Sequence, residues 1–362
     1  RDSWPWLAAS RTGGYLMPNS NLSQDGGAVA APIVVAPWIA RQRDALLQQR
    51  GHAWLLHGPS GLGQFALGMQ MVRAWLCDAP TPHGACGQCG SCHAVDVHAH
   101  TDLCVLMPET YMLALGWPLP EKAQAEIDDK KRKPSQEIRV DAMRDAVEFT
   151  QRTSGRGKGK AVLVYPAEQM NAITANALLK TLEEPPGDAR FVLATEAAHQ
   201  LLPTIRSRCL AHTMQWPLAD EAGTWLATQG VPADQIKGLL QAAGGRPEDA
   251  MAQFEAGRLP AVWKKLPKEL ANGQAGALAN LPAPQVVDAL QKLCHDLLML
   301  RVGAAPRFFD KTDLPAPPAL AVLTRWSKAL AQSLRTADHP FNQGLMLEAL
   351  VAQAASVLQS KR

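Results

Sequence analysis

The stretch that most constrains the fold of this chain runs over residues 159–212. Two short apolar runs with β-branched residues, 161–165 and 191–195, predict buried strands. The residues between them end at Pro185-Pro186, which stops a helix. Apolar residues recur there at helical spacing: Ile173, Ala177, Leu178 and Leu182. A strand, a helix and a strand in so short a span form a βαβ unit, which predicts a parallel sheet.

The last turn of this helix carries two acidic residues, Glu183 and Glu184. The helix dipole disfavours negative charge at that end by about a few tenths of a kcal/mol or more. One interpretation is a solvated helix end that tolerates this cost. The other is an acidic end positioned for a partner, or for a basic group elsewhere in the fold, and the sequence leaves both open.

A second element has the architecture of a phosphate-binding loop. Residues 52–57 predict a strand, Gly58 and Gly63 follow with the GxxxxG spacing, and a helix comes next. However, Gln64 stands where a lysine would reach the phosphates, and Phe65 stands where a hydroxyl would hold Mg²⁺. We therefore expect a degenerate phosphate loop that hydrolyses no nucleotide, or simply a tight turn between strand and helix.

The acidic pair of a working P-loop ATPase is also missing. Such enzymes end the strand corresponding to 162–165 with one carboxylate for Mg²⁺ and one that orients water. Here the strand runs into Pro166 and Ala167, and Glu168 follows one or two residues too late. Loss at two separate catalytic positions argues more strongly against hydrolysis than either loss alone.

Four of the seven cysteines are clustered in sequence. Cys77, Cys86, Cys89 and Cys92 are separated by glycines that allow sharp turns, and two successive CxxC steps predict a tetrahedral, structural Zn²⁺ site. The alternatives are four free thiols, or one of four nearby histidines replacing a cysteine: His83, His93, His98 and His100. A metal site suits a reducing cytoplasm better than a disulfide framework does.

Composition limits the remaining function classes. A chain of 362 residues suggests two or three domains, and its net charge of +3 permits nucleic-acid contact without arguing for it. No apolar run approaches the roughly 18 residues that a membrane-spanning helix needs. We therefore expect a cytoplasmic protein with no membrane partner.

Three motifs together resemble the clamp-loader family of AAA+ proteins. They are NALLKTLEEPP, the strand FVLAT, and the triplet formed by Ser207, Arg208 and Cys209. The four-cysteine insertion is shared by the γ/τ and δ′ members. Because the triplet is kept while the phosphate-loop lysine and the acidic pair are lost, the pattern is similar to the δ′ subunits of the bacterial DNA polymerase III clamp loader.

The resemblance implies a division of labour in DNA replication. Such a subunit has no intrinsic ATPase activity but belongs to a DNA-directed DNA polymerase holoenzyme and helps to load the sliding clamp on primed DNA. Arg208 would be an arginine finger acting in trans on ATP bound only by the neighbouring subunit, and Ser207 would position the turn. The implied partners in this hetero-oligomer are the γ/τ and δ subunits, the clamp and primer–template DNA.

The resemblance also implies a domain order. An α/β AAA+ domain with a parallel sheet would be followed by a small helical lid and an all-α collar. The charged segment 109–137 departs from the family pattern as an insertion. The expected boundaries are a poorly ordered extension (1–35), the AAA+-like domain (36–215) with its zinc insertion (77–92), the lid (216–257) and the collar (258–362).

Two other hypotheses remain open. One is a catalytically active clamp-loader ATPase of the γ/τ type, for which ATP turnover by the isolated chain would decide. The other is a sequence-specific nucleic-acid-binding zinc protein, which would bind duplex DNA alone with a steep salt dependence. Neither explains why the triplet around Arg208 is kept beside a degraded phosphate loop.

Overall fold

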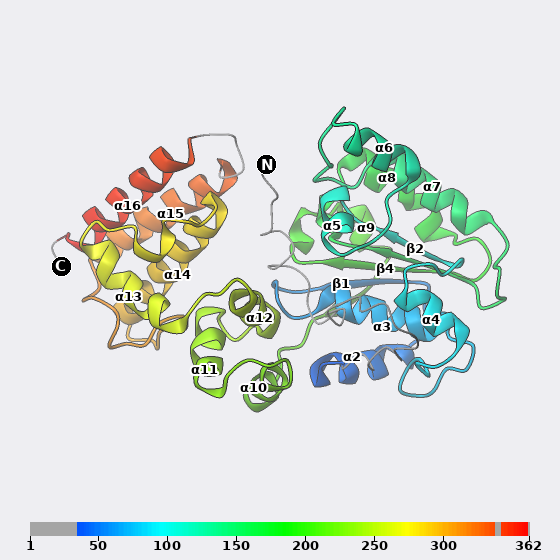
Figure 1. The fold of residues 1–362 in the computed structure, drawn as a ribbon, viewed down its shortest axis with the longest axis horizontal. Coiled ribbons are helices and arrows are strands. Elements are labelled where there is room, and N and C mark those ends of the chain that lie inside the picture. Colours follow the sequence, from blue (N-terminus) through cyan, green and yellow to red (C-terminus); the bar gives the residue numbers. More distant parts are fainter. Residues whose placement is uncertain (1–34, 337–341, 361–362) are drawn as a thin grey trace, which may run out of the picture. The chain divides into compact units, whose positions relative to one another are not determined.

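The computed structural model describes residues 35–336 and 342–360, so the extension predicted over residues 1–35 lies almost entirely outside the described residues. The chain divides into two compact units, which Figure 1 draws in sequence colours. The predicted domain boundaries remain a prediction. Among the described residues, the first unit is residues 35–225 together with Arg246–Ala252, and the second is Leu226–Gly245 together with the residues from Gln253 onward.

A parallel sheet forms the centre of the first unit, as the sequence predicts. Its strand order is β2-β3-β4-β1-β5, and every neighbouring pair is parallel. Near its middle, Leu55 of β1 lies beside Leu193 of β4 and Ala211 of β5. The described strands are β1 (Ala53–His57), β2 (Leu103–Leu106), β3 (Lys160–Val164), β4 (Ala189–Thr195) and β5 (Leu210–Thr213).

Helices cover both faces of this sheet (Figure 1). On one side α3 approaches closely, because a Cβ on its Gly68 would lie 2.7 Å from Leu163 Cδ1. On the other side α7 and α8 bury an apolar core that includes Met143 and Leu178. The helices that flank the sheet on its two sides are α2 (Pro37–Leu47), α3 (Gln64–Leu76), α4 (Gly90–Asp96), α5 (Glu109–Ala114), α6 (Glu121–Asp128), α7 (Val140–Gln151), α8 (Ala172–Glu183) and α9 (Pro203–Arg206).

The helix α8 begins and ends where its sequence directs. Asn171 caps it, because its Oδ1 accepts a hydrogen bond from the Thr174 backbone N–H at 3.0 Å. The helix ends at Glu183, two residues before Pro185. Its acidic end is therefore fixed in place just before the turn into β4.

The segment 109–137 is more ordered than the predicted insertion loop. It contains α5 and α6, and Arg132 joins them by donating from Nη2 to Glu109 Oε1 at 2.8 Å and from Nε to Glu126 Oε2 at 2.7 Å. The three lysines of the basic run 130–133 are exposed. These lysines therefore face solvent, whereas Arg132 holds the two helices together.

The second unit is helical, as predicted. Its core brings together apolar residues such as Leu293, Trp326 and Leu350 from three long helices. The buried Asp296 fixes the loop after α14 by accepting hydrogen bonds from the backbone N–H groups of Phe308 and Phe309. None of the described helices has the length and apolarity needed to cross a membrane. The long helices of this unit are α13 (Pro260–Ala271), α14 (Ala283–Arg301), α15 (Leu320–Thr336) and α16 (Gln343–Leu358). Before them in the chain come α10 (Ala219–Thr228), α11 (Ala233–Ala242) and α12 (Pro247–Glu255), and most of α10 and α12 belongs to the first unit.

Candidate functional site

The predicted phosphate loop connects β1 to α3. Two of its glycines, Gly61 (φ +74°) and Gly63 (φ +93°), adopt the left-handed backbone conformation that favours glycine. A Cβ on Gly63 would lie 2.6 Å from Ile39 Cδ1 and 2.7 Å from Glu248 Oε1. The loop thus has the path of a phosphate loop, but other side chains of the chain pack tightly against it.

Gln64 turns back across its own loop. Its side chain is buried, and Nε2 donates to the carbonyl oxygens of Gly58 at 2.9 Å and Pro59 at 2.8 Å. The next side chain, Phe65, packs against the ring of Tyr165 with a centroid distance of 5.1 Å. The two positions where a nucleotide-binding loop needs a cation and a metal-holding hydroxyl are therefore occupied by an internally bonded amide and an aromatic ring.

Residues at the start of α12 cover the loop. Arg246 Nη1 donates to Ser60 Oγ at 2.7 Å, Ser60 Oγ donates to Asp249 Oδ2 at 3.2 Å, and Arg246 pairs with Asp249. Loss of contact with water raises the pKa of the Glu248 carboxyl well above its usual value, and the nearby charges of Asp249 and Glu196 add to this. Acidic groups of the chain itself thus lie where a phosphate loop would present its N–H groups to an anion.

Glu168, which follows the strand too late for catalysis, is engaged elsewhere. Its carboxylate accepts hydrogen bonds from Thr195 Oγ1 at 2.6 Å and from the Glu196 backbone N–H at 3.1 Å. These contacts join the short helix after β3 to the end of β4. Its oxygens therefore bind the protein rather than face an open metal position.

Arg208 lies between α9 and β5. Its side chain is 29% exposed, and Nε donates to Glu183 Oε1 at 2.7 Å, with Nη2 donating to the same oxygen. Nη1 donates to the Thr204 carbonyl oxygen at 2.8 Å. Ser207 ends α9, and its Oγ donates to the same carbonyl at 3.2 Å. The acidic end of α8 therefore meets a basic group elsewhere in the fold, one of the alternatives that the sequence left open.

The third member of the triplet, Cys209, is an unreactive thiol. Burial raises the pKa of its Sγ to about 12, so the thiolate is scarce at neutral pH. This agrees with a packing role for Cys209, which lies against the apolar core on the α7–α8 side of the sheet.

The four clustered cysteines converge in space. Their Sγ atoms all lie within 4.8 Å of one another, and Cys77 Sγ is 3.5 Å from Cys86, 3.7 Å from Cys89 and 3.6 Å from Cys92. A tetrahedral ion with metal–sulfur bonds of about 2.3 Å would set its ligands roughly 3.8 Å apart, so the arrangement fits a Zn²⁺-sized ion. Among the described residues, no histidine nitrogen belongs to this group.

The environment of the thiols also suits a cation. Backbone N–H groups of Gln88 and Cys89 lower the pKa of Cys86 to about 6, whereas burial raises the pKa of the Cys92 thiol. A bound cation would favour the thiolate form of all four. The nearby His83 is engaged away from the cluster, because its Nδ1 lies 2.9 Å from Asp44 Oδ2.

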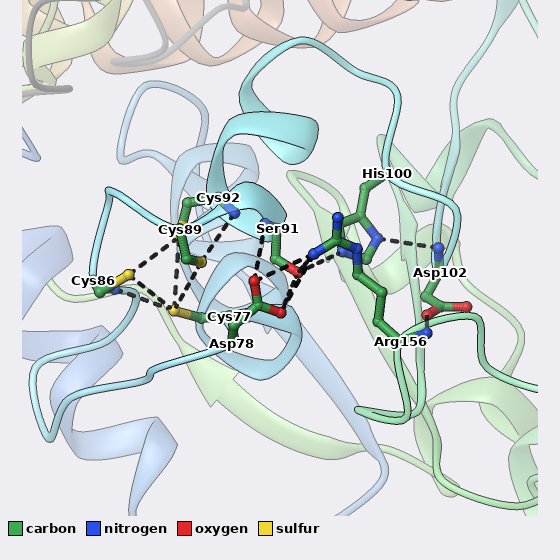
Figure 2. A network of polar contacts seen from close by, with 9 residues as sticks. All are labelled: Cys77, Asp78, Cys86, Cys89, Ser91, Cys92, His100, Asp102 and Arg156. Atoms are coloured by element: carbon green, nitrogen blue, oxygen red, sulfur yellow. Dashed lines mark hydrogen bonds and ion pairs between the residues drawn. The ribbon is translucent and has the colours of Figure 1, made fainter.

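A polar network connects the cysteine loop (residues 77–92) to the basic turn before β3 (residues 152–159) (Figure 2). Buried Ser91 donates to Asp78 Oδ1 at 2.8 Å, and Arg156 Nη1 donates to both Ser91 Oγ and Asp78 Oδ2 at 3.2 Å. His100 Nε2 lies 3.2 Å from the same Ser91 oxygen. The loop that carries the thiols is therefore linked through Arg156 to a segment 65 residues away from Ser91 in sequence.

Asp102 anchors the far end of this network. It is 1% exposed and accepts hydrogen bonds from the backbone N–H groups of Gly155 at 2.8 Å and Arg156 at 2.9 Å, and from Lys160 Nζ at 3.2 Å. Burial opposes its ionisation, but these donors lower the pKa of Asp102 to about 2. Neither Asp78 nor Asp102 stands out in the sequence, because each is a lone carboxylate whose partners are distant.

Comparison with known proteins shows the family to which the chain is similar. Residues 40–217 match the family described as DNA polymerase III, delta subunit. A DNA polymerase III subunit delta′ from Pseudomonas aeruginosa is 40% identical over 80% of this chain and 74% of that protein. The corresponding protein from Escherichia coli is 31% identical over 79% of this chain and 82% of that protein.

Other matches are weaker. A DNA polymerase III tau subunit from Salmonella typhimurium is 30% identical over only 44% of this chain and 21% of that protein. A solved structure of a DNA polymerase III γ subunit-related protein from Thermotoga maritima covers 89% of this chain and 100% of that chain, with 17% identity and a TM-score of 0.47. The two long δ′ matches carry the conclusion, and this chain belongs to the family of DNA polymerase III δ′ subunits.

Proposed function

We propose that this chain is a clamp-loader subunit of DNA polymerase III that hydrolyses no ATP itself and helps to load the sliding clamp on primed DNA. Arg208 then acts in trans as an arginine finger on ATP held by a neighbouring γ/τ subunit. The proposed partners are the γ/τ and δ subunits, with the clamp and primer–template DNA engaged by the assembled complex. Family membership supports this assignment.

The observation that carries the proposal is the contrast between Gln64 and Arg208. Gln64 is buried and forms hydrogen bonds within its own loop. Acidic residues of α12 also cover this loop. Arg208 is partly exposed on a short turn. A guanidinium suits this task because its planar fork stays charged and can contact two phosphate oxygens at once.

The cysteine cluster serves the fold in this proposal. Four protein thiolates leave no open position for water or substrate, so a bound Zn²⁺ would be structural rather than catalytic. Cys77 at the end of α3 and Cys92 on α4 would hold the ion together with Cys86 and Cys89, so a bound ion would tie the two helices to each other. The hydrogen bonds of Ser91 and Arg156 to Asp78 would hold the same loop from outside the thiol cluster.

The test is the ATPase activity of the complex assembled with and without this chain. Arg208→Ala should lower the hydrolysis rate about 10³-fold at the one site that Arg208 completes. The total ATPase activity of the complex should therefore fall by the share that this site contributes. Arg206→Ala is the matched control, because Arg206 is exposed and close to Arg208 on the same turn. Unchanged turnover with Arg208→Ala would contradict the finger, and ATP turnover by the isolated chain would favour the γ/τ-type alternative.

A further inference from the structure

The acidic residue at the end of α8 is poorly placed for the stability of its own helix. Glu183 lies in the last turn, where the helix dipole disfavours a carboxylate. Its side chain is 48% exposed, and the cation that it meets is Arg208, 25 residues further along the chain. The carboxylate of Glu183 therefore does not stabilise its own helix. Its ion pair with Arg208 indicates that its role is to hold the Arg208 side chain.

The contacts of Arg208 fix the orientation of its guanidinium. Glu183 Oε1 accepts from both Nε and Nη2, which holds one edge of the fork. Nη1 is held by the Thr204 carbonyl at 2.8 Å and by a longer contact of 3.4 Å to Ser207 Oγ. The group is thus held from α8 and from α9, two elements that pack on the same sheet.

Such bracing matters for an arginine that must meet a phosphate on another subunit. A free arginine side chain samples many rotamers and loses that freedom when it docks. Holding the guanidinium in one geometry beforehand removes this loss from the docking step, and small misplacements of a catalytic group reduce rates strongly. The contact with Glu183 also keeps the charge of Arg208 close to the surface, because the Glu183 side chain is itself about half exposed.

We propose that Glu183 is a positioning residue for Arg208, holding the guanidinium in the geometry in which it meets the phosphates of ATP on the neighbouring subunit. This inference rests on the proposed function. The opposite role would be a latch, in which Glu183 competes with the phosphate for Arg208. The two roles predict opposite signs, because removing a brace lowers the ATPase rate and removing a latch raises it.

The experiment measures clamp- and DNA-stimulated ATPase of the complete clamp loader assembled with variants of this chain. Glu183→Ala should lower the Arg208-dependent part of kcat roughly tenfold. Glu183→Gln should lower it less, because its amide oxygen still accepts from the fork without charge. KM for ATP should stay unchanged, because the neighbouring subunit holds the nucleotide.

A double-mutant cycle separates positioning from general structural damage. In the Arg208→Ala background, Glu183→Ala should have no further effect on turnover, because the group that it positions is gone. Glu184→Ala is the matched control, since that neighbouring carboxylate is exposed and pairs with no cation among the described residues. Melting of the isolated chain and assembly of the complex should be unaffected by Glu183→Ala.

The outcomes distinguish this inference from the function on which it rests. If Arg208→Ala leaves turnover unchanged, the proposed finger itself fails. If Arg208→Ala lowers turnover but Glu183→Ala leaves it unchanged or raises it, the finger stands and the positioning role is wrong. An equal loss from Glu183→Ala with and without Arg208 would likewise overturn the positioning role.

Discussion

Two glycine-containing loops at opposite ends of α3 differ in what their side chains do. Gly63 precedes the helix in the phosphate loop, and Cys77 follows it at the start of the cysteine loop. In the first loop, Gln64 bonds to the loop itself and Glu248 lies against Gly63. In the second, four sulfurs converge within 4.8 Å of one another.

Glycine spacing therefore predicts the path of a loop but not its ligand. Both loops have left-handed glycines, such as Gly63 at φ +93° and Gly87 at φ +77°. Whether a loop can bind a ligand depends on its side chains. They may form hydrogen bonds with the protein itself, or they may direct several ligand atoms toward one point. The phosphate loop belongs to the first class and the cysteine loop to the second.

Loss of the metal is the largest expected effect and tests the cysteine side of this comparison. Structural Zn²⁺ sites in small peptides have apparent binding free energies of roughly 10–16 kcal/mol. We expect one Zn²⁺ per chain, lost with Cys89→Ser or a strong chelator, and retained with Cys294→Ala. Hydrogen exchange should rise over residues 77–92 while the sheet stays protected.

The basic turn provides an internal control for that experiment. Gly155 and Arg156 are held through their backbone by Asp102, which lies outside the cysteine loop. Their amides should therefore stay protected when the metal is lost, although the Arg156 side chain loses its fixed partners Ser91 and Asp78. A metal-free chain with unchanged exchange at 77–92 would show that the thiols need no ion.

The next largest effect compares one glycine from each loop. Alanine is strained at both Gly63 and Gly87, but only Gly63 is crowded: a Cβ there would lie 2.6 Å from Ile39, whereas nothing lies within 4 Å at Gly87. Gly87→Ala should lower the free energy of unfolding by about 1 kcal/mol, from backbone strain alone. Gly63→Ala should lower it by about 3 kcal/mol, because it adds the clash.

Denaturant unfolding of the two metal-loaded variants measures this difference. Equal losses would mean that the phosphate loop is as open as the cysteine loop, and the contrast between them would be wrong. A larger loss with Gly87→Ala would have the same meaning. Metal content has to be checked in both, because Gly87 lies between two of the cysteines.

The sequence predicts most of the sheet because its buried strands are continuous apolar runs. Strand β3 begins at Lys160 rather than at residue 161, because the lysine is buried and paired with Asp102. The edge strand β5 was not predicted, because most of its residues are exposed and it has no apolar run. Local patterns reveal buried strands well and exposed edge strands poorly.

The site was predictable only as far as its residues are close in sequence. The spacing of the four cysteines predicts their convergence, which the structure bears out. By contrast, Glu248 reaches Gly63 from α12, and Glu183 meets Arg208 across two elements. A single sequence contains no periodic or spacing signal for such long-range pairs, so it leaves their partners open.

A smaller effect concerns the acidic group that lies on the phosphate loop. The folded-state pKa of Glu248 is raised, so the folded chain holds its proton to a higher pH than the unfolded chain does. The stability that Glu248 contributes is complete below its unfolded pKa and falls as pH rises toward the folded pKa. Glu248→Gln should therefore be more stable than the parent chain at pH 8, and the difference should shrink toward pH 4.

Thermal melts of both chains across this pH range provide the measurement. Glu184→Gln is the control, because that carboxylate is exposed and forms no ion pair among the described residues. Loss of stability with Glu248→Gln at pH 8 would indicate that Glu248 is a charged partner of the loop. In that case the loop would still be built to hold an anion, and the contrast with the cysteine loop would weaken.

The smallest expected change is in nucleotide binding by the phosphate loop. Replacing Gln64 and Phe65 with the missing residue types, in the double variant Gln64→Lys and Phe65→Thr, should give no measurable ATP binding. Glu248 and Asp249 still pack against the loop glycines and occupy the space that the phosphates need. Adding Glu248→Ala and Asp249→Ala should then give measurable binding, since the N–H groups and the new lysine face an open position. Displacement of a fluorescent ATP analogue from each variant measures this. ATP binding by the variant with only Gln64→Lys and Phe65→Thr would contradict this expectation. It would show that Gln64 and Phe65, rather than the acidic residues of α12, prevent nucleotide binding.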